Sequence, residues 1–243
     1  METWITELTI ISITYNNSFE LGETISSIKP LLQHGASSII INGGSRVNIS
    51  ELKGFEKQIT LVEEKDEGRY DAINKGIKLV KTNYFMLIHS GDQFISSPKI
   101  IDEIINELNS TSSKLFLGNQ FIDFQGFRRK HTVTFWYPFM INLGAQPPHL
   151  PIIYNSQFAK NQERYSLDYE IISDHLYLKH LFSKKPKYIK SNLYLISMNG
   201  GGATSSGIKS FFRVSEEFLS HYGIFKGLII SIARIPFKFF QML

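Results

Sequence analysis

The segment Leu8-Thr9-Ile10-Ile11-Ser12-Ile13-Thr14 is a run of apolar and β-branched residues, and it ends at the polar triplet Tyr15-Asn16-Asn17. A short apolar run that is bounded by turn-forming residues predicts a strand buried on both faces. The run therefore predicts an interior strand of a sheet.

Strand and helix patterns alternate after this run. Further apolar runs predict strands at 38–41, 59–62 and 84–88, and apolar residues at helical spacing predict helices at 18–34 and 70–81. This order is typical of an open, mostly parallel α/β sheet flanked by helices. Ligands bind such sheets at the carboxyl ends of the strands. The polar residues expected at these ends are Tyr15, Asn16, Asn42, the 64–68 loop and Asp92.

The second half of the chain is less regular. Helices are predicted at 98–108 and 169–182, a strand at 114–118 and a hairpin-like stretch at 121–136. Three prolines keep 146–151 in an extended loop. Neither a fixed-period repeat nor a clean linker interrupts the sequence, which favours one main domain.

Composition excludes several classes of protein and of site. The chain has 243 residues, 42% of them hydrophobic and 20% charged, so a disordered or low-complexity chain is excluded. The sequence has no cysteine, which excludes disulfides, zinc-thiolate sites, iron–sulfur clusters and thiol nucleophiles. The phosphate-loop, dinucleotide-binding and H-E-x-x-H patterns are absent from the sequence as well. Chemistry must therefore come from carboxylates, His, Lys, Tyr or hydroxyl groups.

Positive charge is concentrated near the C-terminal end of the sequence. The formal net charge is +4, and the segment 175–243 holds 10 basic and two acidic side chains. Such an excess fits nucleic acid, an anionic membrane surface or a phosphorylated substrate, and a solvated face is the simplest alternative.

The stretch 224–243 has apolar residues at helical spacing with basic residues opposite them, and Pro236 interrupts it. It is too interrupted for a membrane-spanning helix. A basic amphipathic helix fits the interface of an anionic membrane, and packing on the domain is an equal alternative. The segment 1–15 has no cationic start, so it is not a signal peptide. We expect a domain at 1–207, a helical extension at 208–243, and a cytoplasmic protein peripheral on the inner face of the cell membrane.

Asp92 is the first candidate metal ligand. It lies in a tight Ser90-Gly91-Asp92 turn after a predicted strand, where a carboxylate suits a hard divalent cation. An ordinary turn or helix-cap role is the commoner one for such a residue. The Ser90-Gly91-Asp92 turn indicates a metal site only if other residues suited to the same ligand accompany it.

The stretch 64–76 supplies such residues. Its carboxylates are followed by Gly68 and Arg69 at a predicted helix start, and this combination suits a nucleotide's hydroxyls and phosphates. Taken as structure alone, it is a solvated loop with a capped helix. Asn74 and Gly76 are unusual choices for such a helix, because both lower helix propensity.

Four motifs, in this order and spacing, resemble those of the family 2 glycosyltransferases. They are Ile13-Thr14-Tyr15-Asn16-Asn17, Asn42-Gly43-Gly44-Ser45, Asp66-Glu67-Gly68-Arg69-Tyr70-Asp71-Ala72-Ile73-Asn74-Lys75-Gly76 and His89-Ser90-Gly91-Asp92. The third block is the most specific of the four. The chain most resembles the bacterial group that builds O-antigen, lipopolysaccharide and exopolysaccharide repeat units.

The resemblance implies a GT-A fold, a nucleotide-diphospho-sugar donor, commonly a UDP-hexose, a divalent metal (Mn²⁺ or Mg²⁺), and inversion at the anomeric carbon. It implies that Asp92 holds the metal and that Asp174 is the general base, with Asp168 and Glu170 as nearby rivals. The donor would be contacted by Thr14, Tyr15, Asn16, Asn42, Asp66, Gly68, Arg69, Asn74, Lys75, Ser90 and Gly91. The residues that would lie near the acceptor are His149, Gly201 and Gly202.

Two of these motifs depart from the family pattern. Asn42 stands where the family usually has Asp, and it keeps hydrogen-bonding capacity without charge. His89 and Gly91 stand where many relatives have more carboxylates, which leaves Asp92 as the anionic ligand of that motif.

The expectation is therefore an inverting hexosyltransferase whose saccharide acceptor is carried on undecaprenyl diphosphate, with no nucleic-acid partner. A catalytically degenerate protein of the same fold is one alternative. A basic nucleic-acid-binding protein is another, from a different class.

Overall fold

The computed structural model describes residues 5–47, 53–124, 127–200 and 208–240. The strands are β1 (Leu8–Thr14), β2 (Ser37–Asn42), β3 (Ile59–Glu63), β4 (Tyr84–Leu87), β5 (Gln93–Phe94), β6 (Leu115–Phe124), β7 (Phe127–His131), β8 (Ile152–Asn155) and β9 (Tyr188–Asn199). The helices are α1 (Ser18–Gln33), α2 (Arg69–Leu79), α3 (Pro98–Thr111), the 3-10 helix η2 (Pro138–Leu143), α4 (Ser156–Lys160), α5 (Ser173–Ser183), α6 (Ile208–Tyr222) and α7 (Ile224–Phe240).

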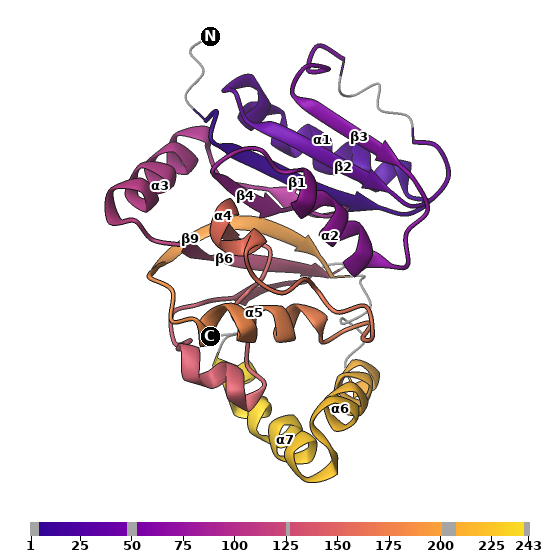
Figure 1. Cartoon of the computed structure of the whole chain (residues 1–243), viewed down its shortest axis with the longest axis vertical. Coiled ribbons are helices and arrows are strands. Elements are labelled where there is room, and N and C mark those ends of the chain that lie inside the picture. The colour runs from indigo at the N-terminus through magenta and orange to yellow at the C-terminus, as the bar shows by residue number, and fades with distance from the viewer. Residues whose placement is uncertain (1–4, 48–52, 125–126, 201–207, 241–243) are drawn as a thin grey trace.

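The strands form one sheet in the order β3-β2-β1-β4-β8-β6-β9-β5, with β7 paired to β6 (Figure 1). Strands β1 to β4 pair in parallel, and Ile10 of β1 lies beside Ser38 on one side and Met86 on the other. Neighbouring side chains of a strand point to opposite faces, and both Ile10 and Ile11 are fully buried, so both faces of β1 are covered. The predicted interior strand of a parallel α/β sheet is confirmed.

Beyond β4 the sheet becomes mixed. Strand β8 lies antiparallel between β4 and β6, and β6 pairs in parallel with β9 across a register shift between Leu117 and Asn119. The hairpin-like stretch expected at 121–136 corresponds to β6 turning into antiparallel β7. The parallel order therefore describes the N-terminal half of the sheet, and the C-terminal half combines both directions.

Helix α2 packs directly on the parallel strands. A Cβ at Gly76 would lie 2.4 Å from Cγ2 of Ile11, so a glycine is required for α2 to approach β1 this closely. Asn74 uses both ends of its amide on the backbone of Tyr165, donating to its carbonyl at 2.9 Å and accepting from its N–H at 3.0 Å. The two poor helix formers of the 64–76 stretch thus hold α2 against its neighbours.

The C-terminal extension packs on the main domain as a helical hairpin. Helices α6 and α7 meet at Gly227, where a Cβ would lie 2.7 Å from the carbonyl oxygen of Phe218. Helix α7 also crosses the end of η2, because a Cβ at Gly144 would lie 2.8 Å from Ile230. A second hydrophobic cluster fills the junction with α5, and its buried members are Ile171, Ile172, Val214, Phe218 and Ile230.

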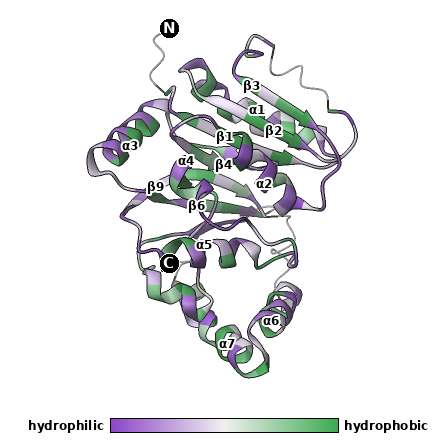
Figure 2. Cartoon of the chain, viewed as in Figure 1, coloured by the Kyte–Doolittle hydropathy of each residue, from purple (hydrophilic) through white to green (hydrophobic). Residues whose placement is uncertain are grey.

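The opposite face of α7 is apolar and exposed. Figure 2 shows hydrophobic residues along α7 at the edge of the molecule. More than half of the surface of each of six large apolar residues is exposed there: Ile224, Phe225, Leu228, Ile229, Ile232 and Ile235. The helix therefore packs by one face and presents the apolar face predicted for it on the other. Within the described residues, no helix is long and apolar enough to cross a membrane.

The close contact of α2 with β1 generates a stability prediction. Replacing Gly76 by Ala should lower the free energy of unfolding by up to about 2 kcal/mol, because overpacking costs about 1–3 kcal/mol and the better helix propensity of Ala offsets about 1 kcal/mol of it. The measurement is urea unfolding followed by circular dichroism. Lys78→Ala, at an exposed position of the same helix, is the control and should change this free energy by less than about 0.5 kcal/mol. A Gly76→Ala variant more stable than the wild type would contradict the packing.

Candidate active site

The loops after β1 and β2 are joined by Asn16. Its side-chain oxygen accepts hydrogen bonds from the backbone N–H and the hydroxyl of Ser45, both at 2.7 Å. Asn16 has a φ of 53°, in the left-handed region that asparagine tolerates better than most residues. Gly44 lies against it, since a Cβ there would be 2.5 Å from Asn16 Oδ1. Thr14 and Tyr15, which are predicted to contact the nucleotide-sugar, come directly before Asn16. The Thr14 hydroxyl donates to the Asn17 carbonyl at 3.4 Å, and Tyr15 is 68% exposed.

Asn42 lies fully buried at the end of β2 and shapes the loop that follows. Its amide nitrogen donates to the Ser45 carbonyl at 2.8 Å, and its oxygen accepts from the Gly44 N–H at 3.1 Å. An aspartate has no N–H to offer Ser45, so the amide is the group that closes this turn. The structure thus gives the departure from the family pattern a local role, and a contact of Asn42 with a base stays a prediction.

The β3–α2 loop lies beside these two loops. Oδ1 of Asp66 accepts from the Gly68 N–H at 3.0 Å, and a Cβ at Gly43 would lie 1.8 Å from Asp66 Oδ2. Lys75 of α2 pairs with Asp71 of the same helix at 3.1 Å and holds the loop by donating to the Lys65 carbonyl at 2.8 Å. Lys75 also pairs with Glu64 at 3.2 Å. Its ammonium group therefore already has anionic partners within its own loop and helix, as Asn74 has its partner in Tyr165.

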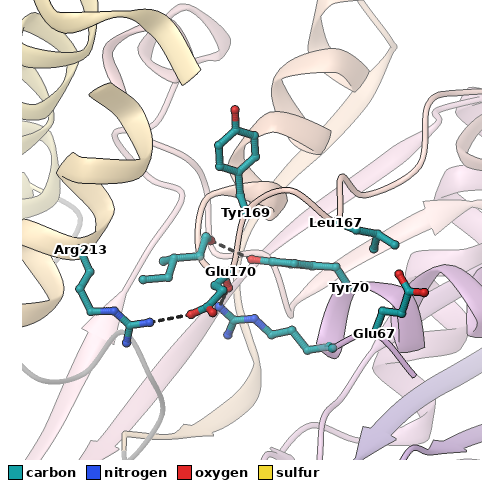
Figure 3. Close-up of a pocket in the computed structure, with 9 residues that line it drawn as sticks. Glu67, Tyr70, Leu167, Tyr169, Glu170 and Arg213 are labelled. Carbon is teal, nitrogen blue, oxygen red and sulfur yellow. Dashed lines mark hydrogen bonds and ion pairs between the residues drawn. The ribbon is translucent and has the colours of Figure 1, made fainter. Parts of the chain in front are cut away.

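Arg69 and Tyr70 face a segment that lies far away in the sequence. The Arg69 guanidinium donates to the carbonyl of Glu170, and the Tyr70 hydroxyl donates to that of Ile171 at 2.8 Å. Burial raises the pKa of Tyr70, so its hydroxyl stays protonated as a donor. Between these elements lies a cavity of about 370 Å³, shown in Figure 3. Arg213 of α6 reaches its rim and pairs with Glu170 at 2.9 Å.

Asp92 is buried at the end of the turn that follows β4. Only 6% of its surface is exposed, and its Oδ1 accepts from the Asn199 N–H at 3.0 Å. Gly91 has a φ of 93°, and a Cβ there would lie 2.9 Å from Glu20 Oε2. Burial, with the nearby charge of Glu20, raises the pKa of Asp92 to about 7. Ser90 completes the turn by donating to the Asn17 carbonyl at 3.3 Å.

This carboxylate suits a cation as a partner. In the part of the chain that the structure describes, no three His, Asp or Glu side chains gather into a metal cluster. A buried carboxylate with a raised pKa is costly to ionise, and a divalent cation beside it would offset that cost. The donor set therefore fits a hard cation that Asp92 would hold and that phosphate oxygens of a ligand would complete.

Asp174 lies in the first turn of α5 and faces the proline-rich loop. Its Oδ2 accepts from the side-chain amide of Gln146 at 2.8 Å and lies 3.7 Å from Nδ1 of His149. Its Oδ1 accepts from the N–H of His175 at 2.8 Å. Burial lowers the pKa of His149, although the Asp174 carboxylate opposes the shift. Asp174 therefore has an uncharged imidazole and an amide donor beside it.

His149 connects Asp174 to the turn of Asp92. Its ring lies 6.3 Å from the ring of His89, centre to centre, and burial lowers the pKa of His89 to about 3. The rival carboxylates lie elsewhere: Asp168 is exposed and accepts from the Ser166 hydroxyl, and Glu170 is exposed and paired with Arg213. Among the three candidates, Asp174 is the one that lies beside an imidazole, that of His149.

The sequence did not single out several residues that the structure brings into this site. Gln146 was visible only as part of a proline-rich loop, and Glu20 and Asn199 had no sequence signal that tied them to Asp92. Gly201 and Gly202, expected near the acceptor, lie outside the described residues.

Comparisons with known proteins identify the family of this chain. The model of the family described as glycosyl transferase family 2 matches residues 9–175. An uncharacterised glycosyltransferase of Mycobacterium tuberculosis is 30% identical over 105 residues, which is 42% of this chain and 40% of that protein. This chain therefore matches about two fifths of the length of the curated relative.

Solved structures show the same fold at low identity. TarS of S. aureus (residues 1–349) superposes with a TM-score of 0.63 at 11% identity, covering 95% of this chain and 72% of that one. The mannosyltransferase PcManGT of Pyrobaculum calidifontis, solved with GDP-Man and Mn²⁺, gives 0.65 at 11%, covering 97% and 72%. TarS has also been solved with UDP, at a TM-score of 0.61, 12% identity and coverage of 88% and 65%. The expected GT-A type of fold is thereby confirmed.

Proposed function

Because this chain belongs to glycosyl transferase family 2, we propose that it transfers a sugar from a nucleotide-diphospho-sugar to a hydroxyl of a saccharide acceptor. The observation that carries the proposal is the series of neighbouring side chains between two carboxylates. Asp92 is buried in the turn that also holds His89, the His89 ring lies 6.3 Å from the ring of His149, and His149 lies 3.7 Å from Asp174. One carboxylate suits the diphosphate end of the donor, and the other suits the reacting hydroxyl.

The proposed donor is a UDP-hexose, which is bound along the ends of β1, β2 and β3. TarS in complex with UDP and with UDP-GlcNAc supports a uridine nucleotide, and PcManGT with GDP-Man shows that the fold accepts guanosine as well. Tyr15 offers an exposed aromatic ring for the base, and Asp66 offers carboxylate oxygens for hydroxyls. Arg69 and Gly68, at the start of α2, would lie toward the diphosphate.

Asp92 would hold a divalent cation, Mn²⁺ or Mg²⁺, which would neutralise the negative charge that develops on the departing diphosphate. PcManGT was solved with Mn²⁺, which supports a metal of this kind. The turn around Asp92 is rigid, because its carboxylate and backbone are bound by Asn199 and Thr24. The position of the carboxylate is therefore set before a ligand arrives.

Asp174 is the proposed general base. Its carboxylate accepts the proton of the acceptor hydroxyl as the hydroxyl oxygen forms a bond to C1 of the donor sugar. The bond between C1 and the diphosphate oxygen breaks on the opposite face, so the configuration at C1 inverts. Gln146 and the His175 N–H hold the two carboxylate oxygens in place. A base that is held in place in this way needs no further reorientation before it accepts the proton, which lowers the entropic cost of the reaction.

The proposed acceptor is a saccharide on undecaprenyl diphosphate, and the protein is proposed to be cytoplasmic and peripheral on the inner membrane leaflet. The exposed apolar face of α7 supports a membrane contact, because such a face buries itself in the interface between headgroups and acyl chains. Lys226, on the same helix, is exposed and suits anionic headgroups. A role in surface polysaccharide synthesis, such as that of O-antigen, follows from such an acceptor.

The nucleic-acid alternative loses support in the described part of the C-terminal extension. Arg234 is buried and lies over the ring of Phe211, at 4.8 Å from its centre, and Arg213 is paired with Glu170. These two guanidinium groups therefore do not contribute to an open basic surface for a phosphate backbone.

The donor site is tested by calorimetric titration of UDP and GDP with and without Mn²⁺ or Mg²⁺. We expect one nucleotide to bind at least about tenfold more tightly with metal, and we expect Asp92→Ala to remove that difference, since the carboxylate is the proposed ligand. Glu103→Ala, at an exposed position of α3, is the control and should behave as the wild type. Metal-dependent binding that persists in Asp92→Ala would refute the assignment, and no binding of any nucleotide would favour the degenerate alternative.

The base is tested by Asp174→Asn. Loss of general-base catalysis should lower turnover about 10²- to 10⁴-fold while nucleotide affinity stays within about twofold. Transfer to an acceptor is measured by chromatography of the product, and binding by calorimetry. Asp168→Asn, which changes the exposed rival, should retain near-normal turnover. Near-normal turnover in Asp174→Asn would remove Asp174 from the role.

The membrane contact is tested by flotation with phosphatidylglycerol vesicles. Changing Phe225, Ile229 and Ile232 together to Ser should lower the bound fraction at least about tenfold, because the exposed face loses its apolar surface. The melting temperature should change little, since these side chains are exposed. Phe19→Ser, at a 77% exposed position of α1, is the matched control. Equal vesicle binding by the triple variant and the wild type would contradict the proposed contact.

A further inference from the structure

The segment that leads into α5 is held by a carboxylate from α6. Glu217 accepts hydrogen bonds from three consecutive backbone N–H groups: that of Glu170 at 3.1 Å on one oxygen, and those of Ile171 at 3.0 Å and Ile172 at 2.8 Å on the other. Three donors on one carboxylate make a well-satisfied anion site. A contact of this kind orders the backbone that it binds.

Helix α5 does not supply this contact itself. Its N-cap residue is Ile172, which makes no side-chain cap hydrogen bond. The first N–H groups of a helix need acceptors, and a polar N-cap side chain usually provides one of them. Glu217 places its negative charge beside the start of the helix, where the helix dipole also favours an anion. Glu217 thus binds the N–H of the N-cap residue and of the two residues before it, while the N–H of His175 in the first turn is accepted by Asp174.

The other side of the same segment is held from α2. The carbonyls of Glu170 and Ile171 accept from Arg69 and from Tyr70, and Figure 3 shows Tyr70 beside Glu170. The N–H groups of the same segment are bound by Glu217. The segment therefore lies between the proposed donor loop and α6, with both edges of its backbone engaged. Asp174 follows it in the first turn of α5.

We propose that Glu217 is a positioning residue for Asp174. The inference rests on the proposed function, in which Asp174 is the base. Glu217 touches neither substrate. It fixes the backbone from which the Asp174 side chain extends toward Gln146 and His149. Glu217 also lies beyond the residues 9–175 that the family model matches, so the C-terminal helical hairpin completes the site from outside that region.

The proposal predicts a loss of turnover without a loss of donor binding. A displacement of about 1 Å of a catalytic group can cost about 10²-fold in rate, so Glu217→Ala should lower kcat about 10- to 100-fold. The KM for the donor should stay within about threefold, because Tyr15, Asp66 and Asp92 are untouched. Glu217→Gln keeps one acceptor oxygen and turns an N–H toward a donor, so it should retain intermediate turnover.

The matched control is Glu216→Ala. Glu216 is the preceding residue of α6, it is exposed, and its replacement removes the same charge. We expect it to leave kcat and KM within about twofold of the wild type. A difference between the two variants then reports the hydrogen bonds of Glu217 and not the charge of the helix.

A second readout needs no activity. Amide hydrogen exchange of Glu170, Ile171 and Ile172, measured by NMR or mass spectrometry, should be at least about tenfold faster in Glu217→Ala than in Glu216→Ala. If the wild type transfers no sugar, the proposed function fails, and the exchange rates still decide whether Glu217 orders this segment. If Glu217→Ala does not fold, Glu217→Gln is compared with Glu216→Ala instead.

Two results would overturn the proposal. One is a Glu217 variant that transfers sugar at the rate of Glu216→Ala. The other is a fall in kcat with amide exchange at residues 170–172 no faster than in Glu216→Ala, which would show that the loss does not come from disorder of this segment. A fall in kcat alone, with faster exchange at residues 170–172 and partial rescue by Gln, supports it.

Discussion

The parallel pairing of β1 with β2 and β4 is the constraint on which the candidate site depends. Parallel strands end at the same edge of a sheet, so the loops after β1, β2 and β4 must lie together. The loops after β1, β2 and β3 approach closely, because Gly44 leaves room for Asn16 and Gly43 for the side chain of Asp66. The sheet thus collects polar groups at one edge before any ligand is considered.

A second constraint acts across the sheet edge. Antiparallel β8 joins the two halves of the sheet, and the proline-rich loop before it carries Gln146 and His149 toward Asp174. The segment before α5 is then fixed between α2 and α6. The start of α2, the segment before α5 and the C-terminal hairpin are therefore held together by hydrogen bonds.

The most specific motif of the sequence has two physical roles. Asn74, Lys75 and Gly76 serve the packing of α2, through the Tyr165 backbone, the neighbouring carboxylates and the close contact with β1. Arg69 lies at the edge of the cavity and faces the segment that leads to Asp174. This motif therefore combines residues that pack α2 against its neighbours with a residue that lines the cavity.

The sequence by itself determined the parallel half of the sheet and the family, because apolar periodicity and short motifs are local patterns, and it predicted Asp92 and Asp174 as candidate site residues. Tertiary structure decided which groups surround these two carboxylates. Gln146, Glu20 and Glu217 act across long sequence separations, and no local pattern records which backbone a side chain will meet. It also decided that α7 both packs and exposes an apolar face, since only packing at Gly144 and Gly227 shows which side faces the domain.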